Sequence, residues 1–435
     1  MAVEPGSPSH VSVALLGGGT VGSQVAQLLL SGSAELAARV GRPLQLTGVA
    51  VRDASKERPG IPTELITTDA TALASSGADV VVELIGGVEP AGDYVAAALK
   101  AGSSVVSANK ALMAERGEEL HRLAEKYGVD LFYEAAVAGA IPLLRPLADS
   151  LAGDQVMRVI GIVNGTTNYI LTRMDEEGAA YDDVLADAQR LGYAEADPTA
   201  DVGGFDAAAK AAILAGLAFH TRVTMSDVYC EGITAVTADD VAAARDMGSV
   251  IKLLAVADLN RDRSGICVRV HPAMVPRTHP LAAVRGAFNA VFVEAESAGE
   301  VMFYGQGAGG APTASAVLGD LVTAARHRVT GSLGAAASTH NAVEILPIAE
   351  AVTSYYVNLA VEDRYGVLAE IAQLFANNGV SIQTLRQDGH DDEARLIIRT
   401  HDAADGALSN TIAQLSQLES VRQVAGVMRA IGEST

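Results

Sequence analysis

Hydrophobic runs of strand length alternate with helical segments through the first third of the chain. Val11–Leu16 is apolar and rich in β-branched residues, and residues 23–30 have the spacing of a helix. Further apolar runs lie at residues 44–51, 79–85, 104–107 and 129–133. Short apolar strands that alternate with helices are typical of a parallel sheet covered on both faces. The pattern predicts a doubly wound, Rossmann-like α/β domain over residues 11–140, after a disordered tail at 1–10.

The middle of the chain has a different pattern. The segments at 156–163 and 264–275 have the pattern of strands with one face toward water. The segments at 181–191 and 206–219 have helical spacing. A second, α+β domain is therefore expected over residues 141–310. A long amphipathic helix at 311–330 is expected to return to the first domain. The stretch after it, rich in Gly, Ala and Ser at its start, is typical of a linker over residues 331–353.

The last part of the chain follows the order strand, helix, strand, strand, helix, strand. These elements are expected at residues 355–361, 366–377, 381–387, 394–400, 407–415 and 421–428. The order βαββαβ is that of a ferredoxin-like fold. A third domain is therefore predicted over residues 354–435.

Composition excludes several classes of protein. Hydrophobic residues make up 49% and charged residues 19%, which is close to an ordinary globular composition. The net charge of −21 repels a phosphate backbone, and the apolar runs are shorter than the roughly 20 residues that span a bilayer. We therefore expect no nucleic-acid partner and no membrane segment. Two cysteines outside any CxxC pair, and no signal peptide pattern in the first ten residues, favour the cytoplasm.

A glycine-rich turn, GGGTVG, follows the first strand. It matches G-x-G-x-x-G between a strand and a helix, which is the context that dinucleotide binding needs. The first glycine permits a tight turn, the second lets the backbone approach a pyrophosphate, and the third lets the helix pack on the strand. The alternative is a glycine-rich turn without a ligand. The predicted cofactor-binding residues here are Leu16, Gly17, Gly19, Thr20, Val21 and Gly22.

The end of the second strand bears on which cofactor is bound. Arg52 could hold a 2′-phosphate through paired N–H donors, whereas Asp53 could bind the ribose hydroxyls of NAD. The pair favours NADP and leaves NAD open. The alternative for Arg52 is an exposed loop residue.

Two lysines stand where chemistry is plausible. Lys110 follows the strand at 104–107, at the edge where open α/β sheets bind ligands, although a solvated surface lysine is the alternative. Lys210 lies one helical turn after Asp206, at the start of an apolar helix. The alternatives there are a plain i,i+4 ion pair or a divalent metal held by the acidic loop. The acidic residues of this segment are Glu195, Asp197, Asp201 and Asp206.

Taken together, these motifs resemble the homoserine dehydrogenase family, in its larger form with a C-terminal ACT domain. The resemblance covers essentially the whole chain after the tail. Besides the glycine-rich turn it rests on SANK (107–110), YEAAVAGAIP (133–142), NGTTNYIL (164–171), LGYAEADPTADVGGFDAAAK (191–210) and YGQGAGGAPTASAV (304–317).

The resemblance implies an NAD(P)-dependent interconversion of L-aspartate 4-semialdehyde and L-homoserine, in the biosynthesis of threonine, methionine and isoleucine. It assigns Lys210 as the acid/base lysine and places Lys110 near the nicotinamide and the reacting oxygen. The substrate-binding residues that it implies are Glu195 and Asp206 for the ammonium, with Asp201 close by, and Thr166. Backbone N–H groups of residues 164–167 are candidates for the substrate carboxylate.

The resemblance also implies further ligands. Gly192 and Gly307 match residues that close over the cofactor. Glu134 and the carbonyl groups of Val137, Gly139 and Ile141 match a monovalent-cation site, for which Na⁺ is expected. Residues 141–310 become the catalytic and dimerisation domain. The ACT domain implies an amino-acid effector, with threonine expected, and a homodimer or homotetramer; the alternative is a purely structural dimerisation module.

Two rival functions come from other mechanisms. A semialdehyde dehydrogenase that oxidises through a thiohemiacetal needs an activated cysteine, and neither Cys230 nor Cys267 lies in such a context. A non-catalytic amino-acid sensor with a vestigial nucleotide fold would bind ligands without turnover. The presence of both lysines together with Glu195 and Asp206 counts against the sensor.

Overall fold

The computed structural model describes the chain except residues 1–8, 335–338, 340, 342, 391–392 and 432–435. Most of the expected tail and part of the expected linker lie outside the described residues. The chain forms two compact units. The first contains Met1–Val156, Ala212–Met225 and Ala295–Ala342, and the second contains Met157–Ala211, Ser226–Glu294 and Val343–Thr435. In the described part, no helix has the length and apolar character needed to cross a membrane.

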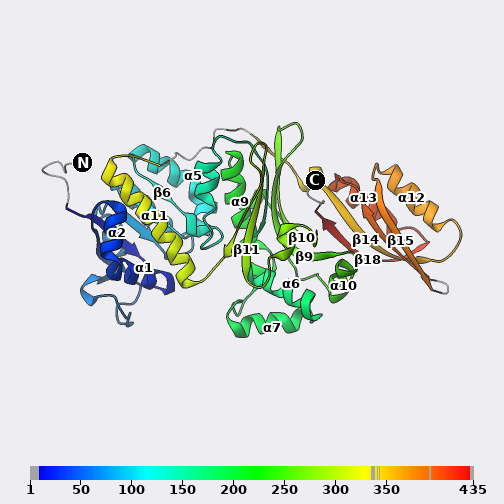
Figure 1. Cartoon of the computed structure of the whole chain (residues 1–435), viewed down its shortest axis with the longest axis horizontal. Coiled ribbons are helices and arrows are strands. Elements are labelled where there is room, and N and C mark those ends of the chain that lie inside the picture. Colours follow the sequence, from blue (N-terminus) through cyan, green and yellow to red (C-terminus); the bar gives the residue numbers. More distant parts are fainter. Residues whose placement is uncertain (1–8, 335–338, 340, 342, 391–392, 432–435) are drawn as a thin grey trace. The chain divides into compact units, whose positions relative to one another are not determined.

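A parallel sheet forms the centre of the first unit (Figure 1), in the strand order β3-β2-β1-β4-β5-β6. The strands are β1 (Val11–Leu16), β2 (Leu44–Ala50), β3 (Ile66–Thr67), β4 (Val80–Glu83), β5 (Ser104–Ser107) and β6 (Leu131–Phe132). The strand order reverses between β1 and β4, so their carboxyl ends flank the crevice where such sheets bind ligands. The predicted doubly wound sheet is confirmed.

Helices cover this sheet. They are α1 (Thr20–Ser31), α2 (Ser33–Val40), α3 (Ala70–Ala74), α4 (Ala91–Lys100), α5 (Lys110–Tyr127) and α11 (Gly310–Thr330). Helix α11, yellow in Figure 1, packs against α1 and α2 at the other end of the sequence. Its buried Val317 and Leu321 share one hydrophobic cluster with Val13 and Leu15 of β1. The helix expected at 311–330 thus buries its apolar side in the core of the first unit. Strand β12 (Gly299–Gln306) also lies in this unit.

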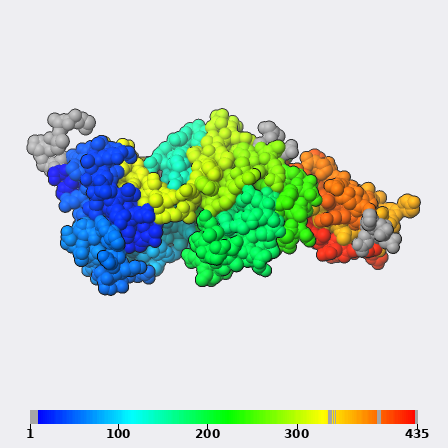
Figure 2. Space-filling view, turned by 60° about the horizontal axis from the view of Figure 1, so that its bottom comes forward, coloured from blue at the N-terminus to red at the C-terminus, as the bar shows by residue number. Residues whose placement is uncertain are grey.

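The second unit contains a long mixed sheet in the order β11-β7-β9-β10-β18-β14-β16-β15. Its strands are β7 (Val156–Ile162), β9 (Ser249–Leu259), β10 (Gly265–Pro276), β11 (Phe288–Ala295), β14 (Val352–Glu362), β15 (Ile382–His390), β16 (Glu393–Thr400) and β18 (Val421–Ala430). Short strands add to it at three places: β8 (Tyr229–Cys230), β13 (Glu344–Ile345) and β17 (Ala403–Ala404). The helices are α6 (Gly165–Glu177), α7 (Tyr181–Leu191), α8 (Thr199–Val202), α9 (Phe205–Phe219), α10 (Ala238–Asp246), α12 (Val367–Asn377) and α13 (Asp405–Leu415). The boundary between the two units falls within α9, after Ala211. Helix α7 lies on the face turned toward the viewer in Figure 2.

Single turns complete the description. They are η1 (Thr63–Leu65), η2 (Glu134–Ala136), η4 (Met225–Asp227), η5 (Pro280–Ala283), η6 (Ile348–Glu350) and the π-helical η3 (Pro146–Ser150). Two of the short elements, β13 and η6, fall within the expected linker at 331–353.

One expectation for the second domain is wrong. The segments 156–163 and 264–275 were expected to face water on one side, but every residue of β10 is buried and β7 is mostly so. Polar residues such as Arg269 and His271 produced the expected alternation. Arg269 is only 2% exposed, and its guanidinium donates to both carboxylate oxygens of Asp258 on β9 at 2.7 and 2.9 Å. A polar side chain that is paired with a charged residue on the neighbouring strand therefore stands where the pattern indicated a water-facing residue.

The C-terminal part has the predicted ferredoxin-like order. Strands β18, β14, β16 and β15 lie side by side, joined through α12 and α13, and the prediction is confirmed. Val357, Leu359, Ile371 and Phe375 belong to its own core. Strand β18 also pairs in parallel with β10, so this sheet is continuous with the rest of the second unit.

Candidate functional site

The glycine-rich turn leaves β1 with little room around two of its glycines. Gly17 has a φ of +112°, and a Cβ atom there would lie 2.7 Å from the carbonyl oxygen of Leu84. A Cβ on Gly22 would lie 1.9 Å from the carbonyl oxygen of Gly17. A Cβ on Gly19, by contrast, would meet nothing within 4 Å. The fold itself thus requires Gly17 and Gly22, whereas Gly19 borders open space at the start of α1, beside Thr20.

The region after β2 is held by an arginine that the sequence analysis missed. Arg58 donates from Nε to the carbonyl oxygen of Gly18 at 3.0 Å, and from Nη1 to the carbonyl oxygen of Asp53. The Asp53 carboxylate accepts from the hydroxyl and the backbone N–H of Ser55, and these bonds lower its pKa. Arg52 is exposed. One carboxylate oxygen of Asp53 therefore bonds within its own turn, and the Arg58 guanidinium contacts the glycine-rich loop.

Lys110 is the first residue of α5, at the carboxyl edge of the sheet, and its side chain is exposed. The residue before it, Asn109, caps α5 with its side-chain oxygen and donates from Nδ2 to the carbonyl oxygen of Gly87 at 2.6 Å. Buried Glu83 accepts from the Ser107 hydroxyl at 2.6 Å. Lys110 therefore follows a loop that buried polar contacts hold in one conformation.

A buried polar cluster in the second unit contains Lys210. Its Nζ donates to Asp206 Oδ2 at 2.7 Å and to the carbonyl oxygen of Val163 at 2.7 Å. Lys210 is 8% exposed and Asp206 is 7% exposed. Asn164 Nδ2 donates to Asp201 Oδ1 at 2.7 Å and to Asp206 Oδ2 at 2.9 Å. The structure thus brings Lys210, Asp206 and Asp201 together and makes the i,i+4 pair a buried one rather than a solvated one.

Other predicted substrate residues are placed differently. Glu195 is exposed, whereas Asp206 and Lys210 are buried. The Thr166 hydroxyl donates to the carbonyl oxygen of Tyr193 at 2.7 Å. The Thr167 N–H donates to Asn164 Oδ1 at 2.9 Å and is not available to a substrate carboxylate. In the described ranges, no three His, Cys, Asp or Glu side chains are grouped as a metal site, so the acidic loop offers no divalent-metal cluster.

The glycines expected to close over the cofactor lie in different units. Gly192 ends α7 with a φ of +79° and has no neighbour that a Cβ would meet within 4 Å. Gly307 lies against Gly139, because a Cβ on Gly139 would come within 2.5 Å of the Gly307 carbonyl oxygen.

The loop expected to bind a monovalent cation is tightly curled. The carboxylate of Glu134 accepts three backbone N–H groups, of Leu143, Leu144 and Arg145, at 2.6, 2.6 and 3.0 Å. Ala138 and Gly139 both have positive φ, at 58° and 56°. In the described chain, the carbonyl groups of Val137, Gly139 and Ile141 accept no backbone hydrogen bond. Carbonyl oxygens suit a hard cation, so this loop fits such an ion through its backbone rather than through the Glu134 side chain.

Asp320 of α11 supports this loop and was not found from the sequence. It accepts from the Glu134 N–H at 2.8 Å and forms an ion pair with Arg145. Burial raises its pKa to about 7.

Neither cysteine has the surroundings of a nucleophile. Burial raises the pKa of the Cys267 thiol to about 11 and also raises that of Cys230. A nucleophilic cysteine needs a lowered pKa. The raised pKa values of both thiols therefore argue against oxidation through a thiohemiacetal.

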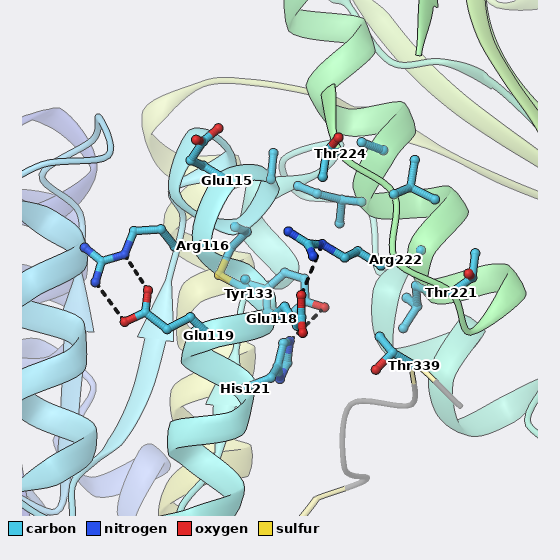
Figure 3. A pocket seen from close by; sticks show the side chains of 18 of the residues that line it. Glu115, Arg116, Glu118, Glu119, His121, Tyr133, Thr221, Arg222, Thr224 and Thr339 are labelled. Carbon is cyan, nitrogen blue, oxygen red and sulfur yellow. Dashed lines mark hydrogen bonds and ion pairs between the residues drawn. The ribbon is translucent and has the colours of Figure 1, made fainter. Parts of the chain in front are cut away.

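A cavity of about 290 Å³ lies in the first unit, between α5 and residues 212–224 (Figure 3). His121 and Tyr133 line it, with 3.3 Å between His121 Nε2 and the Tyr133 hydroxyl. Arg222 pairs with Glu118 there at 3.1 Å. None of the predicted site residues lines this cavity.

We expect His121 to make the protein sensitive to acid. Burial lowers its pKa to about 4, below the 6.5 of an unfolded histidine. The folded state thus binds fewer protons between these values, and stability is lost as the pH falls through this window. Between pH 7 and pH 4.5, the free energy of unfolding should fall less in His121→Gln than in the wild type. The two losses should differ by on the order of 1–3 kcal/mol. Thermal melting at both pH values measures this difference, with exposed His401→Gln as the control. Equal pH dependence of wild type and His121→Gln would contradict the assignment.

Three family models match the chain. They describe homoserine dehydrogenase over residues 142–322, the NAD binding domain of homoserine dehydrogenase over residues 17–134, and an ACT domain over residues 355–420. Together they match all three parts of the fold.

Individual proteins agree with these models. The homoserine dehydrogenase of Corynebacterium glutamicum is 55% identical, over 98% of this chain and 96% of that protein. The crystal structure of a homoserine dehydrogenase from Thiobacillus denitrificans has a TM-score of 0.90 at 38% identity, over 97% of this chain and 98% of that one. A hyperthermophilic archaeal homoserine dehydrogenase in complex with NADPH has a TM-score of 0.61 at 28% identity, over 72% of this chain and 97% of that one. The chain therefore belongs to the homoserine dehydrogenase family, oxidoreductases acting on CH–OH groups, in a form that carries an ACT domain.

Proposed function

We propose that this homoserine dehydrogenase interconverts L-aspartate 4-semialdehyde and L-homoserine in threonine, methionine and isoleucine biosynthesis, with Lys210 as the acid/base residue. The observation that carries the proposal is the buried ion pair between Lys210 and Asp206. A carboxylate and a backbone carbonyl hold this lysine in one orientation, in a position with little access to water. Such a lysine is suited to exchange a proton with a substrate group that is placed in line with it.

Reduction of the aldehyde needs a hydride at carbon and a proton at oxygen. The nicotinamide cofactor supplies the hydride when it is bound. The Lys210 ammonium donates the proton, or stabilises the alkoxide as it forms. Asp206 Oδ2 accepts from Nζ at 2.7 Å and holds the ammonium in place. Lys110 is proposed to lie near the nicotinamide and the reacting oxygen.

The substrate ammonium is proposed to bind to Asp206 and Asp201, with Glu195 joining from the exposed loop. The two aspartates already lie within hydrogen-bond distance of a common donor, Asn164. For the substrate carboxylate we propose the N–H groups of Gly165 and Thr166, because the first-turn N–H groups of a helix have no partner within the helix. These N–H groups open α6.

The proposed cofactor is NADP rather than NAD. Arg52, with Arg58 beside the glycine-rich loop, supplies guanidinium groups for a 2′-phosphate, and Asp53 engages its own turn. The related archaeal enzyme with bound NADPH supports the same choice. Gly192 and Gly307 are proposed to close over the cofactor.

Further ligands and the assembly are also proposals. Na⁺ is proposed at the carbonyl groups of Val137, Gly139 and Ile141, next to Glu134. Threonine is proposed as the effector of the ACT domain, and a homodimer or homotetramer as the assembly. Both cysteines are free thiols, which supports a reducing cytoplasm.

One assay tests the reaction and its ligands. Oxidation of NADPH and of NADH is followed with L-aspartate 4-semialdehyde, in NaCl or in choline chloride, with and without L-threonine. We expect turnover with a higher kcat/KM for NADPH, a requirement for the small cation and inhibition by threonine. Ligand binding without turnover under every condition would favour the sensor and sink the proposed reaction. Turnover unaffected by threonine would leave the ACT domain as a structural module.

A further inference from the structure

We propose that Asn164 is a positioning residue that sets both the geometry and the charge balance around Lys210. The inference rests on the proposed role of Lys210. Asn164 is 4% exposed, and its amide connects three different parts of the second unit: the end of β7, the start of α6 and the segment around α8 and α9 that carries Asp201 and Asp206.

The chemistry of its partners determines the orientation of the amide. Oδ1 accepts from the backbone N–H of Thr167 at 2.9 Å and from its hydroxyl at 3.0 Å. Nδ2 donates to Asp201 and Asp206. A backbone N–H can only donate and an ionised carboxylate can only accept, so a reversed amide would lose these bonds. The side chain therefore both caps α6 and supplies two N–H groups to two carboxylates.

One of those two N–H groups acts directly on Asp206, the partner of Lys210. Asn164 Nδ2 and Lys210 Nζ donate to the same oxygen, Asp206 Oδ2, at 2.9 and 2.7 Å. The residue before Asn164 also contributes, because the Val163 carbonyl oxygen accepts from Nζ at 2.7 Å. The chain at 163–164 thus holds both members of the ion pair.

The two donated hydrogen bonds also reduce the repulsion between the carboxylates of Asp201 and Asp206. Asp201 and Asp206 share one amide nitrogen as donor, and neighbouring carboxylates without a donor repel and take up a proton. Removal of the donors should therefore let Asp206 turn away from Lys210 or become protonated. Either change displaces the acid/base group or alters its pKa.

Asn164→Asp separates the two roles of the side chain. Aspartate keeps an acceptor for the cap of α6 but has no N–H group for the two carboxylates. We expect kcat to fall by about tenfold to a hundredfold, while KM for NADPH changes little. The added negative charge raises the pKa values of Lys210 and of the carboxyl groups, so the pH profile of kcat should move upward by about one unit.

Two further variants keep the test decisive. Asn164→Ser, which caps a helix well and retains one O–H donor, should show a smaller loss and stands in if Asn164→Asp fails to fold. Asp69→Ala removes the cap of α3, where the Asp69 side chain accepts from the Ala72 N–H at 2.8 Å. It should lower the melting temperature and leave kcat and its pH profile unchanged.

The outcomes separate this inference from the proposed function. A wild-type kcat with an unshifted pH profile in Asn164→Asp, or a loss of stability alone, would overturn the positioning role. If the wild type turns over nothing, the proposed function fails. The inference is then decided by competitive acetylation of Lys210 across pH, read from its peptide by mass spectrometry. An upward shift of the labelling midpoint in Asn164→Asp supports it, and an unchanged midpoint overturns it.

Discussion

Replacement of Lys210 by methionine is expected to lower kcat for aldehyde reduction by about a hundredfold to ten-thousandfold, with little change in NADPH binding. Methionine has a similar length but no ionisable group. The substitution therefore removes the proton donor and the cation that would stabilise the alkoxide, and it leaves most of the packing in place. Steady-state kinetics together with a fluorescence titration of NADPH measure the two effects separately.

A second buried lysine supplies the matched control. Lys252 is 3% exposed, donates to Asn168 Oδ1 at 2.8 Å and to the Val284 carbonyl oxygen at 2.6 Å, and has a pKa that burial lowers to about 8. Lys252→Met also removes a buried ammonium from the second unit, but one whose partners are Asn168 and Val284 and not Asp206. It should change the melting temperature and leave kcat near the wild-type value. Equal losses of kcat in both variants would show that Lys210 acts through the fold and not through proton transfer.

Two neighbouring glycines in the dinucleotide turn are expected to respond to alanine in opposite ways. Gly22→Ala should prevent the first unit from folding normally, because its Cβ would lie 1.9 Å from the Gly17 carbonyl oxygen. Gly19→Ala should fold normally, because its φ of −79° suits alanine and its Cβ meets nothing within 4 Å. The same Cβ would stand where the pyrophosphate is expected, and NADPH affinity should fall by about tenfold to a hundredfold.

Melting curves and NADPH titrations of the two variants distinguish these effects. A lower melting temperature is expected for Gly22→Ala alone, and weaker NADPH binding at an unchanged melting temperature for Gly19→Ala. Normal NADPH binding by a well-folded Gly19→Ala would show that the pyrophosphate does not approach this part of the turn.

The parts of the fold that short-range patterns encode were predicted well. Apolar runs and the glycine-rich turn indicated the parallel sheet, because strand, turn and helix there follow one another within about thirty residues. The βαββαβ order was likewise read from alternating segments. Strands β9 and β11 were missed. Strand β10 was predicted to face water on one side, because burial of Arg269 depends on its pairing with Asp258 on a neighbouring strand, which no local pattern describes.

The candidate site divides in the same way. Lys110, Asp206 and Lys210 lie in recognisable motifs, so the sequence by itself was enough to propose them as the groups that carry the chemistry. Asn164 stood in the sequence as the residue before a helix, a usable sign of a cap. Its contacts beyond the cap were decided by tertiary structure, since Asp206 lies 42 positions away.

Arg58 and Asp320 show the same limit, since they act on the Gly18 carbonyl oxygen and on the Glu134 N–H across 40 and 186 positions. Residue types and their local spacing are therefore enough to predict the domain types of this enzyme and to propose its reacting groups. The burial of those groups, and the partners that hold them, depend on which distant segments the folded chain brings within hydrogen-bond distance. Packing of the whole core determines which distant segments meet, so these contacts are seen only in the tertiary structure.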